Sequence, residues 1–454
     1  MALNDIKGKV LIIGAGKSGI SSAGLLKRQG IDFGVFDGAD DITVKDVRDK
    51  NEVFKDADVY VGDITPEQLS SYELAVVSPG IPMMNSAVEK CREAGLSVIG
   101  EIELGYIFSK GKIVAITGTN GKTTTTTLTG EIIKRYAKDV YVAGNIGDPY
   151  TDIADKTTEE SVCVLEISSF QLETVQRFSA DISAVLNVTP DHLDRHGSME
   201  VYAAMKERIA KGERASDVCI LNADNSYCAD FTSRCPAKPV LFSSSKELKD
   251  GYYLKDDIIY ESVSGDSRKL ISMDEVSLVG TCNAENIMAA IALTKALGVS
   301  EDIILDTVRG FKAVPHRIEF AGEKRGVKYY NDSKATNPDS AIQGIKAMKG
   351  PTYLIAGGYD KNASYDEWIN AFDGKVKELV LIGQTARKIA ECARNNGFDK
   401  ITLADGFEEA FRICEGSAKP GENVLLSPAC ASWGMFNNFE ERGDLFKKMA
   451  GEIT

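Results

Sequence analysis

The chain has 454 residues, of which 43% are hydrophobic and 26% charged, a composition typical of a soluble globular protein with about two to four domains. The net charge of −14 argues against a nucleic-acid-binding protein, because an acidic surface repels the phosphate backbone. The nine cysteines form no CxxC pair, so the spacing indicates neither a disulfide framework nor a zinc site. Without a signal-peptide layout or an apolar run of about 18 residues, the sequence predicts a cytoplasmic protein with no membrane span.

The first hundred residues predict a parallel sheet with crossover helices. Apolar strands are expected at residues 10–13, 32–37 and 74–77, with helical segments between them. The first strand runs into residues 14–19 (GAGKSG), which match the dinucleotide fingerprint, with Asp37 at the end of the next strand. This fingerprint serves NAD or the diphosphate of a nucleotide-sugar, and a purely structural tight turn is the alternative.

The second unit opens near residue 100 and contains a phosphate-binding loop. A buried strand at residues 113–117 is followed by residues 117–124 (TGTNGKTT) and then by a helix. Glycines let backbone N–H groups wrap around phosphate oxygens, Lys122 neutralises the outer phosphates, and the Thr123 hydroxyl is suited to Mg²⁺. Ile116 occupies the position of the first glycine in the strict motif, so this is a shortened variant. The alternative is a turn with a surface lysine.

Three further strands of this unit, at residues 141–143, 162–167 and 182–188, end in polar residues. Parallel sheets bind ligands at the carboxyl ends of their strands. The polar residues at these ends are Asn145, Glu166, Ser168, Ser169, Asn187, Asp191 and His192. The Glu166 carboxylate is a candidate Mg²⁺ ligand, since hard cations favour carboxylate oxygen; a solvated strand-end carboxylate is the alternative.

A helix is predicted at residues 198–211. Val201, Met205 and Ile209 form an apolar stripe with helical spacing, and periodicity alone makes the neighbouring Lys206 a surface lysine. Short β-strands with turns are expected from residue 236 to 278.

The predicted fold class is α/β with three domains. The third unit starts near residue 313, and strands at residues 328–331, 353–356, 379–382 and 424–427 alternate with helices. We therefore expect a Rossmann-like N-terminal domain, a central P-loop ATPase-like domain with a mostly parallel sheet, and a Rossmann-like C-terminal domain. Their predicted boundaries are 1–99, 100–312 and 313–454.

Several motifs resemble those of the Mur ligases, the amide synthetases of peptidoglycan precursors. Residues 117–124 resemble their ATP loop, and residues 165–172 (LEISSFQL), 331–337 (NDSKATN) and 426–432 (LSPACAS) are similar to signatures that follow in the same order. The resemblance covers essentially the whole chain. It implies that ATP phosphorylates the carboxylate of UDP-N-acetylmuramoyl-L-alanine, that the amine of D-glutamate attacks the acyl phosphate, and that the enzyme is a cytoplasmic monomer.

The resemblance also implies site residues. The catalytic residues would be Lys122, His192, Lys206 and Lys334. The ATP-binding residues would be Gly118, Thr119, Asn120, Gly121, Lys122, Thr123, Thr124, Asn283, Asn286, Arg317 and Asp332. The ligands of two Mg²⁺ ions would be Thr123, Glu166, His192 and a carbamylated Lys206. The residues binding the UDP-linked substrate would be Gly14, Gly16, Lys17, Ser18, Asp37, Ser78, Gly80, Asn145 and Ser168. The D-glutamate-binding residues would be Thr336, Lys361, Ser432 and Phe439.

Some of these positions have structural alternatives. Cys282 stands where the family has a histidine before its adenine-binding asparagines, so Asn283 is alternatively a helix cap. Ser432 is alternatively a helix N-cap, Phe439 a core residue and Lys361 a solvent-facing loop lysine.

Three other functions compete with the amide ligase. The first is a related ligase with a different amino acid or acceptor, as in folylpolyglutamate synthase; residues 14–19 argue against it, because that family lacks such a leading unit. A nicotinamide-dependent dehydrogenase leaves Lys122 unexplained. A non-enzymatic P-loop nucleotide switch leaves residues 331–337 and 427–432 without a function.

Overall fold

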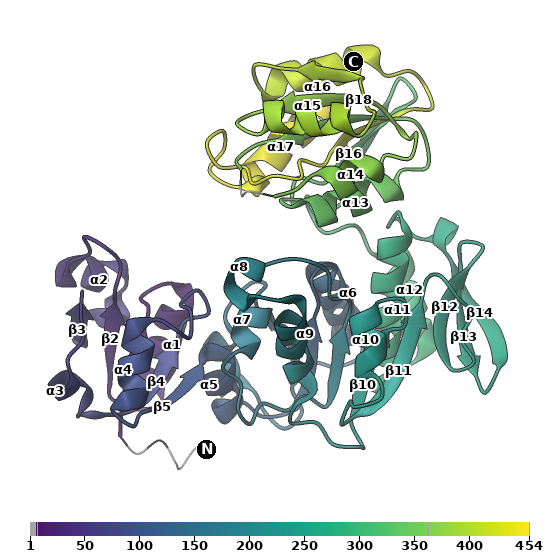
Figure 1. The fold of residues 1–454 in the computed structure, drawn as a ribbon. Helices are drawn as coiled ribbons and strands as arrows, with labels where there is room; N and C mark the ends of the chain where they lie inside the picture. Colours follow the sequence, from purple (N-terminus) through teal and green to yellow (C-terminus); the bar gives the residue numbers. More distant parts are fainter. Residues whose placement is uncertain (1–5, 7, 361–362, 454) are drawn as a thin grey trace. The chain divides into compact units, whose positions relative to one another are not determined.

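The structure, a computed structural model, describes residue 6, residues 8–360 and residues 363–453. The chain forms two compact units, which we describe separately (Figure 1). The first contains the described residues up to Tyr253 together with Glu261–Arg268 and Ile287–Thr307, and the second contains the remaining described residues.

A five-stranded parallel sheet begins the first unit, with the order β3-β2-β1-β4-β5. Its strands are β1 (Lys9–Ile13), β2 (Phe33–Asp37), β3 (Asp58–Val61), β4 (Tyr72–Val77) and β5 (Ser97–Gly100). Its helices are α1 (Lys17–Arg28), α2 (Val44–Lys50), α3 (Pro66–Leu69), α4 (Ser86–Glu93) and α5 (Glu101–Phe108). Because β1 lies between β2 and β4, the loop that follows β1 emerges between the ends of those two strands.

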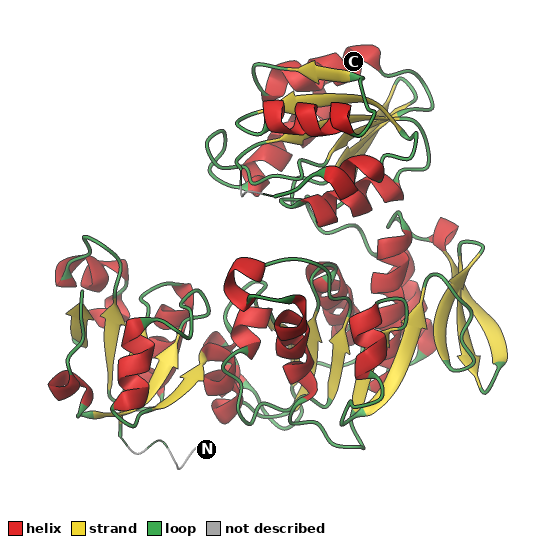
Figure 2. Cartoon of the chain, in the orientation of Figure 1, coloured by secondary structure: helices red, strands yellow, loops and turns green. Residues whose placement is uncertain are grey.

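The second sheet has nine strands in the order β14-β13-β12-β11-β10-β9-β6-β8-β7, and the pairs from β7 to β12 are parallel. Its strands are β6 (Lys112–Thr117), β7 (Val140–Gly144), β8 (Val162–Glu166), β9 (Ile182–Val185), β10 (Val218–Asn222), β11 (Lys238–Ser243), β12 (Gly251–Lys255), β13 (Ile258–Val263) and β14 (Asp266–Ser272). The α-helices of this region are α6 (Lys122–Lys134), α7 (Ser169–Leu172), α8 (Leu193–His196), α9 (Met199–Glu207), α10 (Ser226–Phe231), α11 (Thr281–Ala296) and α12 (Glu301–Gly310). Helices separate the strands from β6 to β11, whereas β11, β12, β13 and β14 follow one another directly. Figure 2 shows the helices in red and the strands in yellow.

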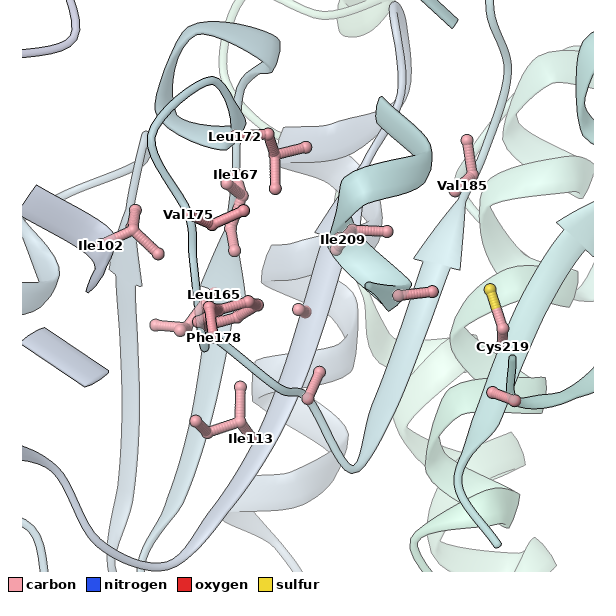
Figure 3. Close-up of a cluster of buried hydrophobic side chains, with 14 of the residues drawn as sticks. Ile102, Ile113, Leu165, Ile167, Leu172, Val175, Phe178, Val185, Ile209 and Cys219 are labelled. Atoms are coloured by element: carbon pink, nitrogen blue, oxygen red, sulfur yellow. The ribbon is translucent and has the colours of Figure 1, made fainter. Parts of the chain in front are cut away.

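A buried hydrophobic cluster supports one face of the second sheet (Figure 3). Ile113 of β6, Leu165 of β8 and Cys219 of β10 contribute to it, and each is at most 3% exposed. Phe178 and Ile209 pack against them from the segments that cover this face. Each such aliphatic or aromatic side chain contributes about 1.5–3 kcal/mol when fully buried, so the strand ends rest on a stable base.

The third sheet belongs to the second unit and has the order β15-β16-β20-β17-β18-β19. Only the β15–β16 pair is antiparallel among the described pairs of this sheet. The strands are β15 (Glu319–Lys324), β16 (Val327–Asn331), β17 (Thr352–Gly357), β18 (Val376–Ile382), β19 (Ile401–Leu403) and β20 (Asn423–Leu426). The helices are α13 (Pro338–Ala347), α14 (Asp366–Asn370), α15 (Ala386–Asn395), α16 (Phe407–Ser417) and α17 (Phe439–Glu452).

The α/β class with three mostly parallel sheets is confirmed, and the exact domain boundaries stay a prediction.

Two structural interpretations of the sequence, for Lys206 and for Ser432, are wrong. Val201 is 45% exposed, and the buried face of α9 is formed by Tyr202, Ala203 and Lys206, so Lys206 is not a surface lysine. Ser432 begins no helix, because Asn438 is the residue that caps α17. Among the described residues no helix is long and apolar enough to cross a bilayer.

We predict that Gly19→Ala destabilises the first sheet. A Cβ atom at Gly19, in the first turn of α1, would overlap the carbonyl oxygen of Gly14, whereas one at Gly16 would meet nothing within 4 Å. The overlap should cost about 1–3 kcal/mol. Urea unfolding should therefore show a lower midpoint for Gly19→Ala and a nearly unchanged one for the matched control Gly16→Ala. Equal midpoints for both variants and the parent would contradict this packing.

Candidate active site

The phosphate-binding loop joins β6 to α6. Gly121 has φ +85°, a left-handed conformation that favours glycine, and it directly precedes the first residue of α6. Lys122 donates hydrogen bonds from Nζ to the carbonyl oxygens of Gly118 and Thr119, at 2.8 and 2.9 Å. The loop thus places an ammonium group and a helix N-terminus together, as binding of a phosphate chain requires.

Asn187, which follows β9, holds this loop. Its Oδ1 accepts a hydrogen bond from the Asn120 backbone N–H at 2.8 Å, and its Nδ2 donates to the Asn120 carbonyl at 3.2 Å. The Thr119 N–H donates to the Asn187 carbonyl oxygen at 2.9 Å. The sequence placed Asn187 at a strand end but gave it no role, because nothing in the local pattern shows that β9 lies beside β6.

Glu166 ends β8 on the other side of the loop and is 2% exposed. Asn145 Nδ2 donates a hydrogen bond to Glu166 Oε1 at 2.8 Å, so the side chain of Asn145 holds one oxygen of this carboxylate. Glu166 Oε2 is buried and has no hydrogen-bond partner among the described residues. An unpaired buried carboxylate oxygen is costly, and it is the type of donor that Mg²⁺ prefers, so this position fits the implied metal ion.

Lys206 is 1% exposed and lies beneath the same loop. Its Nζ donates to the Gly118 carbonyl oxygen at 2.8 Å and lies 4.6 Å from the centre of the Tyr202 ring. Burial, together with repulsion from Lys122, holds the pKa of Lys206 well below that of an ordinary lysine. The amine is therefore neutral more often than a surface lysine at the same pH.

The two neighbouring histidines have different surroundings. His192 has φ +52°, and its side chain is 49% exposed. His196 is buried against Phe170 and Tyr202, and its Nε2 lies 3.1 Å from Ser169 Oγ. Burial lowers the pKa of His196 and favours a neutral ring. His196 therefore packs the site, while His192 is accessible to a ligand.

Most of the residues expected to bind the UDP-linked substrate lie at the end of β1 and of its neighbouring strands, whereas Asn145 and Ser168 follow β7 and β8 of the second sheet. Ser78 Oγ donates to the Gly14 carbonyl oxygen at 3.2 Å, and Asp37 accepts from the Ala15 N–H at 3.3 Å. Lys17 Nζ donates to the Gly147 carbonyl oxygen at 2.6 Å. The first sheet thus brings the Gly14 loop, Ser78 and Asp37 together.

Three other members of this set differ in setting. Gly80 is exposed, whereas Ser18 is half-buried in the first turn of α1. Ser168 caps α7 in a reciprocal capping box with Gln171, so its hydroxyl has a structural task.

Arg195 connects the loop after β4 to the second sheet and was missed from the sequence. Its Nη1 donates to the Pro79 carbonyl oxygen at 2.9 Å and its Nη2 to that of Ile81 at 3.1 Å. The same guanidinium forms an ion pair with Glu173, with 2.6 Å between Arg195 Nη2 and Glu173 Oε2. Its Cζ atom lies 4.2 Å from the centre of the Phe170 ring. No local motif marks this role, because the partners are far apart in the chain.

In the second unit, the motif loops follow the neighbouring strands β16 and β20. Lys334 Nζ lies 5.6 Å from the centre of the Phe439 ring, so these two predicted site residues come together. Thr336 is half-buried in the same loop, and Ser432 is 4% exposed. Lys361 lies outside the described residues.

Asp332 is fully buried directly after β16. It accepts hydrogen bonds from Ser427 Oγ at 2.8 Å and from the Ile318 N–H at 3.2 Å, and Arg317 lies 3.9 Å away. Burial raises the pKa of Asp332 to about 6, although Arg317 and these hydrogen bonds oppose the shift. Asp332 therefore fixes the turn at residues 316–318; its contact with ribose stays a prediction.

Arg442 of α17 links the two motif loops and was also missed. It is 1% exposed and donates to Ser333 Oγ at 2.9 Å, to the Ser333 carbonyl oxygen at 2.8 Å and to the Cys430 carbonyl oxygen at 3.3 Å. The buried guanidinium holds residues 331–337 and 426–432 in one arrangement.

The two predicted adenine-binding asparagines lie in the first turns of α11. Asn283 Nδ2 donates to the Val279 carbonyl oxygen at 2.8 Å, and Asn286 Nδ2 donates to Asn283 Oδ1 at 3.1 Å. Asn283 is inside the helix, so the alternative of a helix cap is wrong. Burial raises the pKa of Cys282 to about 12, so this thiol stays protonated and uncharged.

Family models match most of the chain. The MurD-like N-terminal domain of Mur ligases matches residues 8–100, the Mur ligase middle domain residues 116–294, and the glutamate ligase domain of Mur ligases residues 316–430. A protein of Lachnoclostridium phytofermentans named UDP-N-acetylmuramoylalanine--D-glutamate ligase is 49% identical over 98% of both chains. Proteins of the same name from Lachnospira eligens and Clostridioides difficile are 47% and 42% identical, over 99% and 98% of this chain and 100% and 98% of theirs. The chain belongs to the Mur ligase family of ATP-dependent ligases.

Solved structures agree on the fold. MurF ligase from Thermotoga maritima in complex with ADP has a TM-score of 0.60 at 18% identity and covers 99% of this chain and 97% of its own. A pseudomurein peptide ligase type C from Methanothermus fervidus has a TM-score of 0.58 at 18% identity, over 92% and 96% of the two chains.

We predict that Asn187→Ala weakens ATP binding. The substitution removes two side-chain hydrogen bonds that hold the phosphate loop, each worth about 0.5–1.5 kcal/mol, so the Kd for ATP should rise about tenfold. Asn225→Ala is a matched control, since Asn225 holds the Val188 carbonyl after the same strand without touching the loop. Equal ATP affinities for both variants in calorimetric titration would refute the role of Asn187.

Proposed function

We propose that this Mur ligase joins D-glutamate to the carboxylate of UDP-N-acetylmuramoyl-L-alanine through an acyl-phosphate intermediate, with ATP as co-substrate. The observation that carries the proposal is the edge of the second sheet. There the buried Lys206 bonds to the phosphate loop, and the buried Oε2 of Glu166, at the end of the neighbouring strand, has no hydrogen-bond partner among the described residues. Full-length relatives whose name specifies the same reaction support the choice of substrates.

The chemistry begins with carboxylate activation, because a carboxylate oxygen is a poor leaving group. A carboxylate oxygen attacks the γ-phosphorus and ADP leaves with the bridging oxygen. The D-glutamate amine then attacks the acyl carbon, the amine gives up a proton, and inorganic phosphate takes the electrons of the broken C–O bond. Lys122 and the N–H groups of the loop stabilise the charge that develops on the phosphates.

The proposal includes two Mg²⁺ ions. Thr123, Glu166, His192 and carbamylated Lys206 would hold them, and the ions would supply positive charge beside the phosphates and the reacting carboxylate. The lowered pKa of Lys206 supports the modification, since the neutral amine adds to CO₂ with loss of one proton. The product is a carboxylate-like ligand in place of a buried amine.

The remaining residues bind substrates. Asn283, Asn286, Arg317 and Asp332 contact the nucleoside part of ATP. The UDP-linked substrate is bound by Gly14, Gly16, Lys17, Ser18, Asp37, Ser78, Gly80, Asn145 and Ser168. Lys334 stands at the reacting groups, and D-glutamate is held by Thr336, Lys361, Ser432 and Phe439. We further propose that the enzyme is a monomer and acts in the cytoplasm, where the nucleotide-linked precursor and ATP are available.

The specificity prediction is that phosphate is released from ATP and UDP-N-acetylmuramoyl-L-alanine only when D-glutamate is added. L-Alanine, L-lysine and diaminopimelate should give no release. Lys122→Ala should lower kcat/KM by about a thousandfold, because it removes the cation beside the phosphates. Lys134→Ala is the matched control, since Lys134 lies on the same helix and forms an ion pair with the exposed Glu131. Release with another amino acid, or none with D-glutamate, would reject the function.

The carbamylation prediction concerns Lys206. Incubation with ¹³C-bicarbonate should produce one protein-bound carbamate resonance in the ¹³C NMR spectrum, and Lys206→Arg should lack it because a guanidinium does not react with CO₂. Lys211→Arg, which changes an exposed lysine just beyond the same helix, should keep the resonance. A spectrum without the resonance, or one unchanged by Lys206→Arg, would exclude a carbamate at this position.

A further inference from the structure

Three potential metal ligands lie together at the other end of the strands from the phosphate loop. Cys219 is the second residue of β10 and pairs with Ser183 of β9, so it is near the amino ends of both strands. Glu213 precedes β10, and Cys235 follows α10. We call these three residues the Glu-Cys-Cys cluster. Figure 3 shows the Cys219 sulfur at the border of the hydrophobic cluster.

The geometry of the Glu-Cys-Cys cluster suits a small cation. One ligand atom from each residue, two sulfurs and a carboxylate oxygen, lies within 4.8 Å of the others. Around a tetrahedral ion with metal–sulfur bonds of about 2.3 Å, two sulfurs are about 3.8 Å apart. Small side-chain rotations therefore bring all three atoms into coordination distance.

Glu213 supplies an independent indication of a ligand. The residue is 6% exposed, and both its carboxylate oxygens are buried without a hydrogen-bond partner among the described residues. A buried carboxyl group without any partner is rare and costly, and a bound cation would satisfy it. Burial raises the pKa of Glu213 to about 9, although interaction with the Ser183 hydroxyl opposes the shift. Cys235, Asp217 and Asp181 act in the same direction as burial.

The two thiols also favour a cation. Interaction with Cys219 lowers the pKa of Cys235, so Cys235 is the member of the pair that more readily becomes a thiolate. Cys235 is half-buried, which gives an ion a route from solvent, whereas Cys219 is fully buried. The nearby Glu207 adds negative charge, although it is paired with Arg234 at 2.6 Å.

We propose that the Glu-Cys-Cys cluster binds one thiophilic divalent cation of the zinc class through Glu213, Cys219 and Cys235. Two sulfur ligands select a soft or borderline ion over Mg²⁺, which prefers oxygen. Binding releases the protons of both thiols and of the Glu213 carboxyl group. The ion joins the segment before β10, the strand itself and the segment after α10, so its role is to stabilise this end of the sheet, independently of the ligase reaction.

Cadmium is a suitable probe, because cadmium–thiolate bonds absorb in the near ultraviolet. The reduced, chelator-treated full-length chain should bind one equivalent of Cd²⁺ with a charge-transfer band. An excess of Zn²⁺ should displace the probe, and the same excess of Mg²⁺ should not. Cys235→Ser should weaken binding by more than about a hundredfold, since even the loss of an indirect partner of a metal ligand costs 10–100-fold. Glu213→Gln should keep the thiolate band but weaken binding.

Cys392→Ser is the matched control, because Cys392 is also half-buried and also lies next to a carboxylate, that of Asp366. It should bind Cd²⁺ like the parent. X-ray absorption of the zinc-loaded parent should show two sulfur ligands, a measurement that does not depend on any variant folding. Absence of a one-equivalent band, or a band that survives Cys235→Ser, would overturn the proposal. So would a protein that binds no metal when reduced and forms a Cys219–Cys235 disulfide when oxidised by air.

Discussion

The parallel pairing of β6 between β8 and β9 is the constraint on which the site depends. It places the ends of three strands at one edge, so the phosphate loop emerges between Glu166 and Asn187. Asn187 fixes the loop backbone, and Lys206 bonds to the Gly118 carbonyl from below. If this register shifted by one residue, the inward and outward faces of β6 would exchange and the loop would lose these partners.

The other two sheets use the same arrangement. β1 lies between β2 and β4, which brings Asp37 and Ser78 to the Gly14 loop. β20 lies between β16 and β17, and Arg442 ties the loops after β16 and β20 together. Each sheet thus offers a loop at the carboxyl end of an internal strand, the position where open α/β sheets bind ligands. A ligase that brings together a nucleotide-sugar, ATP and an amino acid needs three ligand-binding positions, and the three sheets offer one such loop each.

The sequence predicted the strands and loops that have strong local patterns. The apolar run before GTNGKT and the glycines around it predict β6, its loop and α6, because strand, turn and helix each depend on nearby residues. The burial of Lys206 was not predictable, since its partner Gly118 is 88 positions away and periodicity pointed to Val201 instead. Asn187, Arg195 and Arg442 were missed for the same reason. Their roles depend on which strands and loops become neighbours, and no local motif encodes that.

The central claim is that the substrate carboxylate is activated by phosphorylation at this edge. The most direct measurement places ¹⁸O in the carboxylate of UDP-N-acetylmuramoyl-L-alanine and analyses the phosphate released with ATP and D-glutamate by mass spectrometry. An acyl phosphate requires that one carboxylate oxygen leaves with the phosphorus, so the account predicts one ¹⁸O atom in each phosphate formed. Unlabelled phosphate accompanied by amide product would contradict it.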